Sequence, residues 1–324
     1  DISLRNLLKI RFRLGMFDPP SKVPYSNISY DVLESHSHQE QALKMARQSM
    51  VLLKNDKKTL PLSSKTKKIA LIGPNANNQI TQLGNYNGIP SKNVTLLDAL
   101  RAEKGIEIVY DSISDFIKLN EGIDLERFAD KYKDVDLIIY AGGISPMLEG
   151  EEGDAGGLEG FVGGDRTTIN LPSIQTEVMK KLNLLGKPMI FICMSGGAMA
   201  FNWEAENLPV IIQAWYGGQA TGTALADILF GRYNPSGKLP VTFYHSDTDI
   251  PSIEDYSMAN RTYRYFDKDV LYPFGYGLSY TSFKYNKLLC PVEAQIGDTL
   301  SVKVEVSNTG TVSYTHLRAH ETVL

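Results

Sequence analysis

Carboxylates that could carry acid/base chemistry are gathered in one glycine-rich stretch, residues 141–172. The first of them, Glu149, follows Met147 and Leu148, which could give its side chain an apolar wall. Apolar surroundings favour the protonated carboxyl that a general acid needs near neutral pH. The other acids of the stretch are Glu151, Glu152, Asp154, Glu159 and Asp165. The stretch therefore predicts a carboxyl placed for proton transfer.

The length of this stretch favours a functional loop. It runs for about thirty residues, where connections of about 2–6 are usual between strands and helices of α/β units. Its glycines permit close approach of a ligand to the backbone. Two alternatives stay open from the residues alone: a solvated acidic loop, and a calcium site. The spacing of the acids does not match the D-x-[DN]-x-[DN]-G pattern of a calcium loop.

A serine nucleophile is a second possibility. The run Cys193–Gly197 follows an apolar stretch and half resembles the G-x-S-x-G elbow around Ser195. Cys193 stands where the elbow has its first glycine. His245 precedes Asp247, whereas the elbow's histidine follows its acid. A tight strand-to-helix turn at Ser195 is the simpler interpretation.

Other residues point less clearly to a ligand. Gly142-Gly143 is too short for a dinucleotide fingerprint, no phosphate-binding P-loop occurs, and we expect no cofactor and no metal. His36 and His38 have metal-like spacing but precede a polar helix start, where exposure is expected. Trp203 and Trp215 could be platforms for a sugar, although large aromatics beside strands more often belong to the core.

Short apolar runs alternate with amphipathic stretches along the middle of the chain. The expected strands are 69–72, 106–110, 137–140, 189–194, 210–214 and 238–243, and the expected helices are 38–53, 95–101, 125–132, one beginning at Ser173, and 220–230. The alternation predicts an α/β fold with a mostly parallel sheet sandwiched by helices. Ligands of such sheets bind at the carboxyl ends of the strands. Ligand contacts are therefore expected in the loops that follow Ile72, Tyr140, Met194 and Ala214.

The flanking segments differ in character. Apolar residues within 4–14 predict a helix that needs a packing partner, and Pro-rich residues 19–30 suit a linker. The aromatic segment 261–280 predicts an extended strap packed on the α/β unit. Alternation over 300–306 indicates a half-exposed strand that opens a β-sandwich. Residues 313–324 do not continue this pattern and are interpreted as a non-native tail.

Composition excludes several classes of protein. The 324 residues are 43% hydrophobic and 22% charged, with a net charge of −4, which favours neither nucleic acid nor an anionic membrane as partner. No apolar run approaches the roughly 20 residues of a membrane span. Two cysteines make no disulfide framework.

Long motifs stand in order along the chain: VLLKNDKKTLPL (51–62), IALIGPNA (69–76), LEGEE with GGDRTTINLP (148–172), GKPMIFI (186–192), NWEAE (202–206), AWYGGQATGTALADILFGRYNPSGKLPVTF (214–243) and YPFGYGLSYT (272–281). Together they resemble glycoside hydrolase family 3 over roughly residues 1–312. GISPMLEGEE, GGDR and RTYRYF are most similar to its bacterial and plant-like β-xylosidase branch.

The resemblance implies a domain order. A (β/α)8 barrel comes first, then an α/β sandwich, and often a fibronectin-III-like domain. It makes residues 1–35 the end of a missing barrel and a linker. It makes 36–283 the sandwich and 284–312 the truncated start of a fibronectin-III-like domain.

The resemblance also implies the site. The acid/base comes from the loop 141–170, where Glu149 aligns best, with Glu151 and Glu152 as alternates. Asp165 and Arg166 match a D-R pair that we expect to bind substrate or fasten the loop. The nucleophilic aspartate lies in the barrel and is therefore absent from this chain.

The function predicted on this basis is that of a fragment of a retaining, exo-acting glycosidase, most like a β-xylosidase. Its substrates would be terminal β-D-xylosyl residues of plant-derived xylo-oligosaccharides. Its partners would be that oligosaccharide and the barrel in cis, and the fragment alone would be inactive. A periplasmic or secreted location is expected for the intact enzyme. The alternatives are a β-glucosidase of the same family, a non-catalytic carbohydrate-binding module, and a serine esterase using Ser195.

Overall fold

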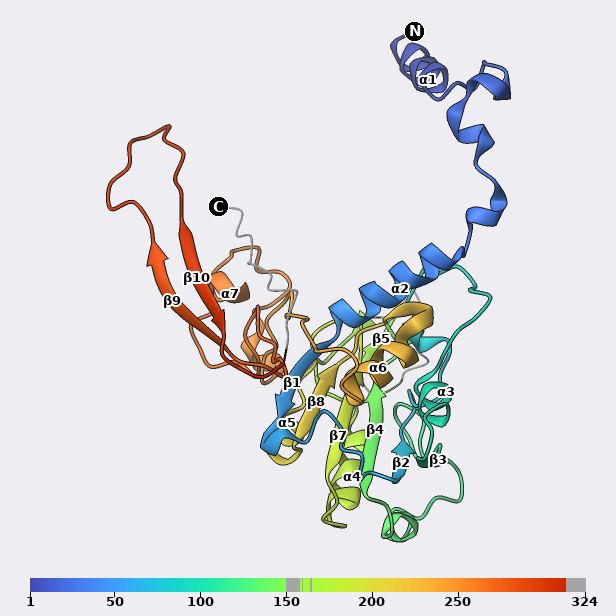
Figure 1. Cartoon of the computed structure of the whole chain (residues 1–324), viewed down its shortest axis with the longest axis vertical. Helices are drawn as coiled ribbons and strands as arrows, with labels where there is room; N and C mark the ends of the chain where they lie inside the picture. The colour runs from blue at the N-terminus through green and yellow to red at the C-terminus, as the bar shows by residue number, and fades with distance from the viewer. Residues whose placement is uncertain (150–157, 159, 164, 313–324) are drawn as a thin grey trace. The chain divides into compact units, whose positions relative to one another are not determined.

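The computed structural model describes residues 1–149, 158, 160–163 and 165–312. The chain divides into two compact units, Asp1–Gln41 and Ala42–Leu324. The second unit carries the central sheet (Figure 1) and the glycine-rich stretch 141–172, called the acidic loop from here on. The tail predicted at 313–324 lies outside the described residues.

A six-stranded sheet forms the centre of the second unit, in the order β1-β8-β7-β4-β2-β3. The strands are β1 (Val51–Asn55), β2 (Lys68–Ile72), β3 (Glu107–Asp111), β4 (Leu137–Gly143), β7 (Met189–Met194) and β8 (Val210–Gln213). All neighbouring pairs are parallel except β1 with β8, which is antiparallel. The predicted α/β class with a mostly parallel sheet is confirmed.

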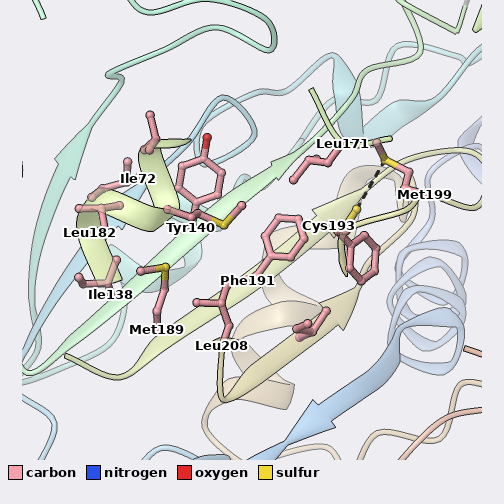
Figure 2. Packing of buried hydrophobic residues seen from close by; sticks show 14 of the residues in the cluster. Ile72, Ile138, Tyr140, Leu171, Leu182, Met189, Phe191, Cys193, Met199 and Leu208 are labelled. Atoms are coloured by element: carbon pink, nitrogen blue, oxygen red, sulfur yellow. Dashed lines mark hydrogen bonds between the residues drawn. The ribbon is translucent and has the colours of Figure 1, made fainter. Parts of the chain in front are cut away.

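Alternate residues of the central strands face two separate cores. In β4, Ile138 and Tyr140 face one core, which contains Phe191 of β7 (Figure 2). Their neighbours Leu137 and Ile139 face the other. Because strand side chains alternate between faces, continuous apolar runs are what a sheet covered on both sides requires.

Helices cover both faces. The first core packs on α4 (Ser173–Asn183), α5 (Asn202–Asn207) and the 3-10 helix Phe128–Tyr132. The second packs on the end of α2 (His36–Ser49), on α3 (Leu96–Arg101) and on α6 (Thr221–Leu229). Thr95 closes a capping box on α3 with Asp98, as its position before the apolar run predicts.

Three predicted elements differ from the structure. The helix expected over 125–132 is a 3-10 helix that spans only Phe128–Tyr132. The helix expected over 38–53 ends at Ser49, and Val51 begins β1, because Val51 and Leu52 pair with β8 and Val51–Leu53 are buried. No strand forms over 238–243. Pro240 lacks the N–H that a ladder needs, and the segment makes only the bridge Phe243–Tyr272.

The aromatic strap is largely extended, as predicted, but begins with one helical turn, α7 (Thr262–Tyr265). Its later part binds the α/β unit through the backbone. Leu278 donates to the carbonyl of Leu52, and Leu239 donates to that of Tyr276. The strap therefore covers the edge of the sheet at β1.

The first unit contains α1 (Ile2–Arg13) and three short 3-10 helices, Pro20–Lys22, Pro24–Asn27 and Tyr30–Val32. No residue of α1 is buried by the described part of the chain, and Ile10 and Phe12 are among its exposed side chains. The predicted helix is confirmed. That it ends a barrel remains a prediction.

The C-terminal described segment is a two-stranded antiparallel hairpin of β9 (Phe283–Leu289) and β10 (Lys303–Asn308) (Figure 1). One strand therefore lies slightly later than the alternation over 300–306 predicts. The start of a fibronectin-III-like domain remains a prediction, since two strands are compatible with many folds. Among the described helices, none has both the length and the apolar character to cross a membrane.

The two cysteines should differ sharply in reactivity. Cys193 is fully buried beside Met199 (Figure 2), and burial raises the pKa of its thiol to about 12, whereas Cys290 is exposed. Because the thiolate is the reactive form, we expect one thiol to react with Ellman's reagent in the native chain and two in denaturant. Cys290→Ser is the control and should leave no fast thiol. Rapid reaction of two thiols in the native chain would contradict the buried core.

Glu204 should make stability depend on pH. It is 1% exposed in α5 and accepts a hydrogen bond from Thr176, and burial raises its pKa. A raised folded-state pKa contributes stability that is present below the unfolded pKa and is lost as pH rises through the folded pKa. We therefore expect Glu204→Gln to raise Tm relative to the wild type more at pH 7 than at pH 4.5. Glu206→Gln, an exposed change on the same helix, should show no such pH trend; equal behaviour of the two variants would refute the assignment.

Candidate active site

The acidic loop leaves the sheet from a rigid start. Gly143, the last residue of β4, has a φ of 106°, and a Cβ there would lie 2.1 Å from the carbonyl oxygen of Met194. The buried side chain of Gln175 holds this residue from both sides, accepting from its N–H at 2.9 Å and donating to its carbonyl at 2.7 Å. Asn75 donates to the carbonyl of Gly142 at 2.9 Å. The direction in which the loop departs is therefore determined by packing and hydrogen bonds.

The side chain of Glu149 is held close to the sheet. Its Oε2 accepts the backbone N–H of Gly196 at 2.8 Å and the hydroxyl of Tyr216. Nη1 of Arg166 lies 3.7 Å from Oε1. Asn85 donates to the backbone carbonyl of Glu149 at 3.5 Å. The groups around the carboxyl itself are two hydrogen-bond donors and one cation, so its oxygens act as acceptors.

The residues around Glu149 come from four loops. Glu149 follows β4, Gly196 follows β7, Tyr216 follows β8 and Asn85 lies in the connection after β2. The carboxyl ends of parallel strands meet at one edge of the sheet. The loops singled out after Ile72, Tyr140, Met194 and Ala214 do meet there.

Each of the two donors to Glu149 depends on a local feature: Tyr216 on a protonated hydroxyl, and Gly196 on the absence of a side chain. Burial, with Glu149 beside it, raises the pKa of Tyr216 well above its usual value, so its hydroxyl stays protonated and donates. A Cβ at Gly196 would lie 2.9 Å from Oε2 of Glu149 and 3.2 Å from the Tyr216 ring. A side chain at position 196 would therefore push the carboxyl away from its two donors.

The apolar wall predicted for Glu149 is wrong in one half. Met147 is 73% exposed, whereas Leu148 packs against the first core. Leu148 turns inward because the residues 145–149 form a turn in which Leu148 and Glu149 both donate to the carbonyl of Ser145. The neighbours of the carboxyl are therefore polar, and the sequence gives no local sign of this.

Arg166 lies between the acidic loop and the turn after β7. It lies in β6 (Asp165–Arg166), which pairs with β5 (Phe161–Val162), and it donates to the carbonyl of Ala198 at 3.1 Å. Its Nη2 is buried without a hydrogen-bond partner among the described residues. Asp165 is exposed. The nearest carboxylate described for Arg166 is thus Glu149 rather than Asp165.

The serine elbow is not assembled. Ser195 is fully buried, donates to the carbonyl of Gly197 at 2.8 Å and accepts from Gln213 at 3.0 Å. In the described part of the chain, the ring of His245 contacts Asn202 and Asp269 instead. Ser195 therefore shapes the turn after β7, which is the simpler interpretation.

Asp247, the supposed acid of that elbow, also has another task. It accepts from the hydroxyl of Thr168 at 2.6 Å and from the N–H of Ile169 at 2.7 Å. It thereby fastens the end of the acidic loop to the segment before the strap.

Other candidates lie apart from Glu149 or outside the described residues. His36 and His38 are exposed, and within residues 1–149 and the later described segments no group of three or more metal-ligand side chains occurs. The alternates Glu151 and Glu152 are outside the described residues. Trp203 and Trp215 both pack partly on the first core.

Sequence patterns did not identify Tyr216, Gly196 and Asn85 as partners of Glu149. The feature that could have identified them is their position, because each follows a strand of the parallel sheet at its carboxyl end. Tyr216 stands two residues after Ala214, inside a motif already noted for its resemblance.

A family model described as the glycosyl hydrolase family 3 C-terminal domain matches residues 50–280. A xylan 1,4-beta-xylosidase of Xylanibacter ruminicola is 34% identical over 94% of this chain and 52% of its own length. A periplasmic beta-glucosidase of Salmonella typhimurium is 33% identical over 96% of this chain and 44% of its own. The chain thus spans about half the length of these relatives.

Solved structures agree with this match. A GH3 exo-beta-xylosidase in complex with a xylobiose aziridine activity-based probe superposes with a TM-score of 0.71 and 31% identity. The similarity covers 82% of this chain and 34% of that one.

The contact of Gly196 with Glu149 can be tested by a pair of alanine substitutions. Gly196→Ala should lower the free energy of unfolding by about 0.5–1.5 kcal/mol, because its Cβ displaces the carboxyl of Glu149 and weakens the hydrogen bond from the backbone N–H of residue 196. Gly197→Ala is the matched control: its Cβ would have Nη1 of Arg166 as nearest atom, at an ordinary 3.8 Å, so a change within about 0.5 kcal/mol is expected. Urea unfolding measures both. Equal losses would show that the carboxyl does not constrain position 196.

Proposed function

Because this chain belongs to glycosyl hydrolase family 3, we propose that it supplies the general acid/base of a retaining, exo-acting β-glycosidase. Glu149 takes that role. The observation that carries the proposal is the anchoring of a single carboxyl at the carboxyl-terminal edge of the sheet by donors from two neighbouring loops. Such anchoring serves proton transfer, since a general acid must be held within hydrogen-bond reach of the reacting atom.

In this proposal Glu149 acts twice. A retaining enzyme holds its two carboxyls about 5–5.5 Å apart across the scissile bond. While the nucleophile attacks the anomeric carbon, Glu149 donates a proton to the leaving oxygen. It then removes a proton from the water that releases the sugar. Since both strong donors bind Oε2, Oε1 is the oxygen that we assign to proton transfer.

The nucleophile would come from a barrel domain of a longer polypeptide. Two observations support this part: the relatives are about twice as long as this chain, and α1 exposes an apolar side. Residues 1–35 would then be the end of the barrel and the linker, and 284–312 would start a fibronectin-III-like domain. The chain alone is expected to cleave no aryl β-xyloside.

The sugar removed is proposed to be xylose, from the ends of xylo-oligosaccharides. Support comes from the relatives whose names are β-xylosidases, including one from Xylanibacter ruminicola and a probable beta-D-xylosidase 7 of Arabidopsis thaliana. The Salmonella relative named a β-glucosidase favours glucose as the second candidate. Comparing kcat/KM for p-nitrophenyl β-xyloside and β-glucoside decides between them.

The role of Glu149 predicts a dependence on the leaving group. In the longer polypeptide, Glu149→Gln should lower kcat/KM for xylobiose by about 10²–10⁴-fold, because the leaving oxygen then receives no proton. Cleavage of 2,4-dinitrophenyl β-xyloside should lose far less in its first step, since that leaving group needs no acid. Steady-state and burst kinetics measure the two steps.

The controls separate residue assignment from general damage. Glu177→Gln, an exposed change on α4, should leave both substrates unaffected. Glu151→Gln and Glu152→Gln should not show the leaving-group pattern. If one of them showed it and Glu149→Gln did not, the acid/base would be that residue. Activity lost equally on both substrates would instead indicate a structural role for Glu149.

A further inference from the structure

The residue that precedes Tyr216 has an unusual backbone conformation. Trp215 has a φ of 56°, which lies in the left-handed region that an aromatic residue rarely adopts. Residues other than glycine keep such a conformation only where their surroundings hold them, and they are common at functional sites. The contacts of Trp215 therefore show what holds the backbone from which the Tyr216 hydroxyl reaches Glu149.

The indole of Trp215 is bound to the end of α2. Its Nε1–H donates to the backbone carbonyl of Ser49, the last residue of this helix, at 3.1 Å. The last carbonyls of a helix have no partner within the helix, so the indole satisfies a group that needs an external donor. The ring also meets Phe243 edge to face, with 6.1 Å between the ring centroids. Both the polar and the apolar parts of the side chain are thus held.

The residue that follows Tyr216 lies against the same part of the chain. A Cβ at Gly217 would be 3.5 Å from Cε of Met50, which comes directly after α2 and is fully buried. The backbone of Met50 is itself closely packed, because a Cβ at Gly237 would be 2.2 Å from its carbonyl oxygen. Tyr216 is therefore flanked by two residues that lie against Ser49 and Met50.

We propose that Trp215 is a positioning residue for the acid/base. Its bond to Ser49 keeps the backbone at Trp215 left-handed, and this backbone places the Tyr216 hydroxyl on Oε2 of Glu149. Trp215 thus acts on the carboxyl through Tyr216. The consequence for catalysis rests on the proposed function of Glu149, whereas the positioning of the carboxyl can be measured without it.

Amide hydrogen exchange of this chain tests the positioning without any hydrolysis. The N–H of Gly196 is bonded to Oε2 of Glu149, so its exchange rate reports whether the carboxyl stays in place. Trp215→Phe keeps an aromatic ring but removes the indole N–H, and Tyr216→Phe removes only the hydroxyl. Each should speed exchange at Gly196 about fivefold, the change in an opening equilibrium that the loss of one hydrogen bond causes.

Two controls separate positioning from a general loosening of the strand end. The N–H of Ala214, directly before Trp215, donates to the carbonyl of Cys193 at 2.8 Å, and its exchange should not change in Trp215→Phe. Trp203→Phe alters the other tryptophan of the chain and should leave the exchange of Gly196 unchanged. Equal acceleration at Ala214 and Gly196 would mean that Trp215 only stabilises the end of β8. That result, or an unchanged rate at Gly196, would overturn the proposal.

Kinetics of the longer polypeptide test the path through Tyr216. Trp215→Phe and Tyr216→Phe should each lower kcat for xylobiose about tenfold and leave the first step with 2,4-dinitrophenyl β-xyloside nearly unchanged, because that leaving group needs no acid. The double variant should lose no more than Tyr216→Phe alone, since residues that act through one contact are not additive. Multiplied losses would show that Trp215 acts by another route and would contradict the proposal.

Failure of this proposal and failure of the proposed acid/base are distinguishable. If Glu149→Gln lacks the leaving-group pattern, the acid/base assignment is wrong, and exchange at Gly196 still decides on the positioning. If Glu149→Gln shows the pattern but Trp215→Phe changes neither turnover nor exchange, the acid/base stands and the positioning is wrong. Thermal unfolding checks that each variant is folded. If Trp215→Phe is not, benzothienylalanine at position 215, which keeps the ring shape and removes only the N–H, replaces it in both measurements.

Discussion

The bond from the Gly196 N–H to the carboxylate of Glu149 is the contact on which the site depends. It joins the end of β7 to the loop after β4, and a side chain at position 196 would displace the carboxyl. The Tyr216 hydroxyl adds a donor from the end of β8 to the same oxygen. The position of this carboxyl oxygen thus depends on the ends of three adjacent strands, β4, β7 and β8. Any shift between those strands is transmitted directly to the group that we assign to proton transfer.

The double-sided sheet makes that precision possible. Each central strand places alternate side chains in two packed cores. The sheet therefore cannot shift against either layer of helices without leaving a void. Gln175 and Asn75 then carry this rigidity past the strand ends into the loop. The start of the acidic loop is therefore supported by hydrogen bonds that are themselves buried, whereas the bond from Gly196 to Glu149 lies at the surface.

Much of this arrangement follows from local pattern, and the exceptions have a common cause. Buried strands such as 189–194 and the capped helix after Thr95 are visible in the sequence, because periodicity and capping are local properties. The helical stripe that includes Met50 continues to Leu53, and only the pairing of Val51 and Leu52 with β8 makes this stretch a strand. Glu149 stood out within an unusual loop, but its partners Gly196 and Tyr216 did not. They are defined by strand order, which a single sequence does not display.

The left-handed turn at Trp215 has a consequence for how such a protein can change. The φ of Trp215 is 56°, a backbone conformation that an aromatic residue rarely adopts. The indole N–H of Trp215 donates to the carbonyl of Ser49, and the hydroxyl of the next residue, Tyr216, donates to Glu149. A substitution that relaxed the backbone at Trp215 would therefore also move the hydroxyl that holds the carboxyl.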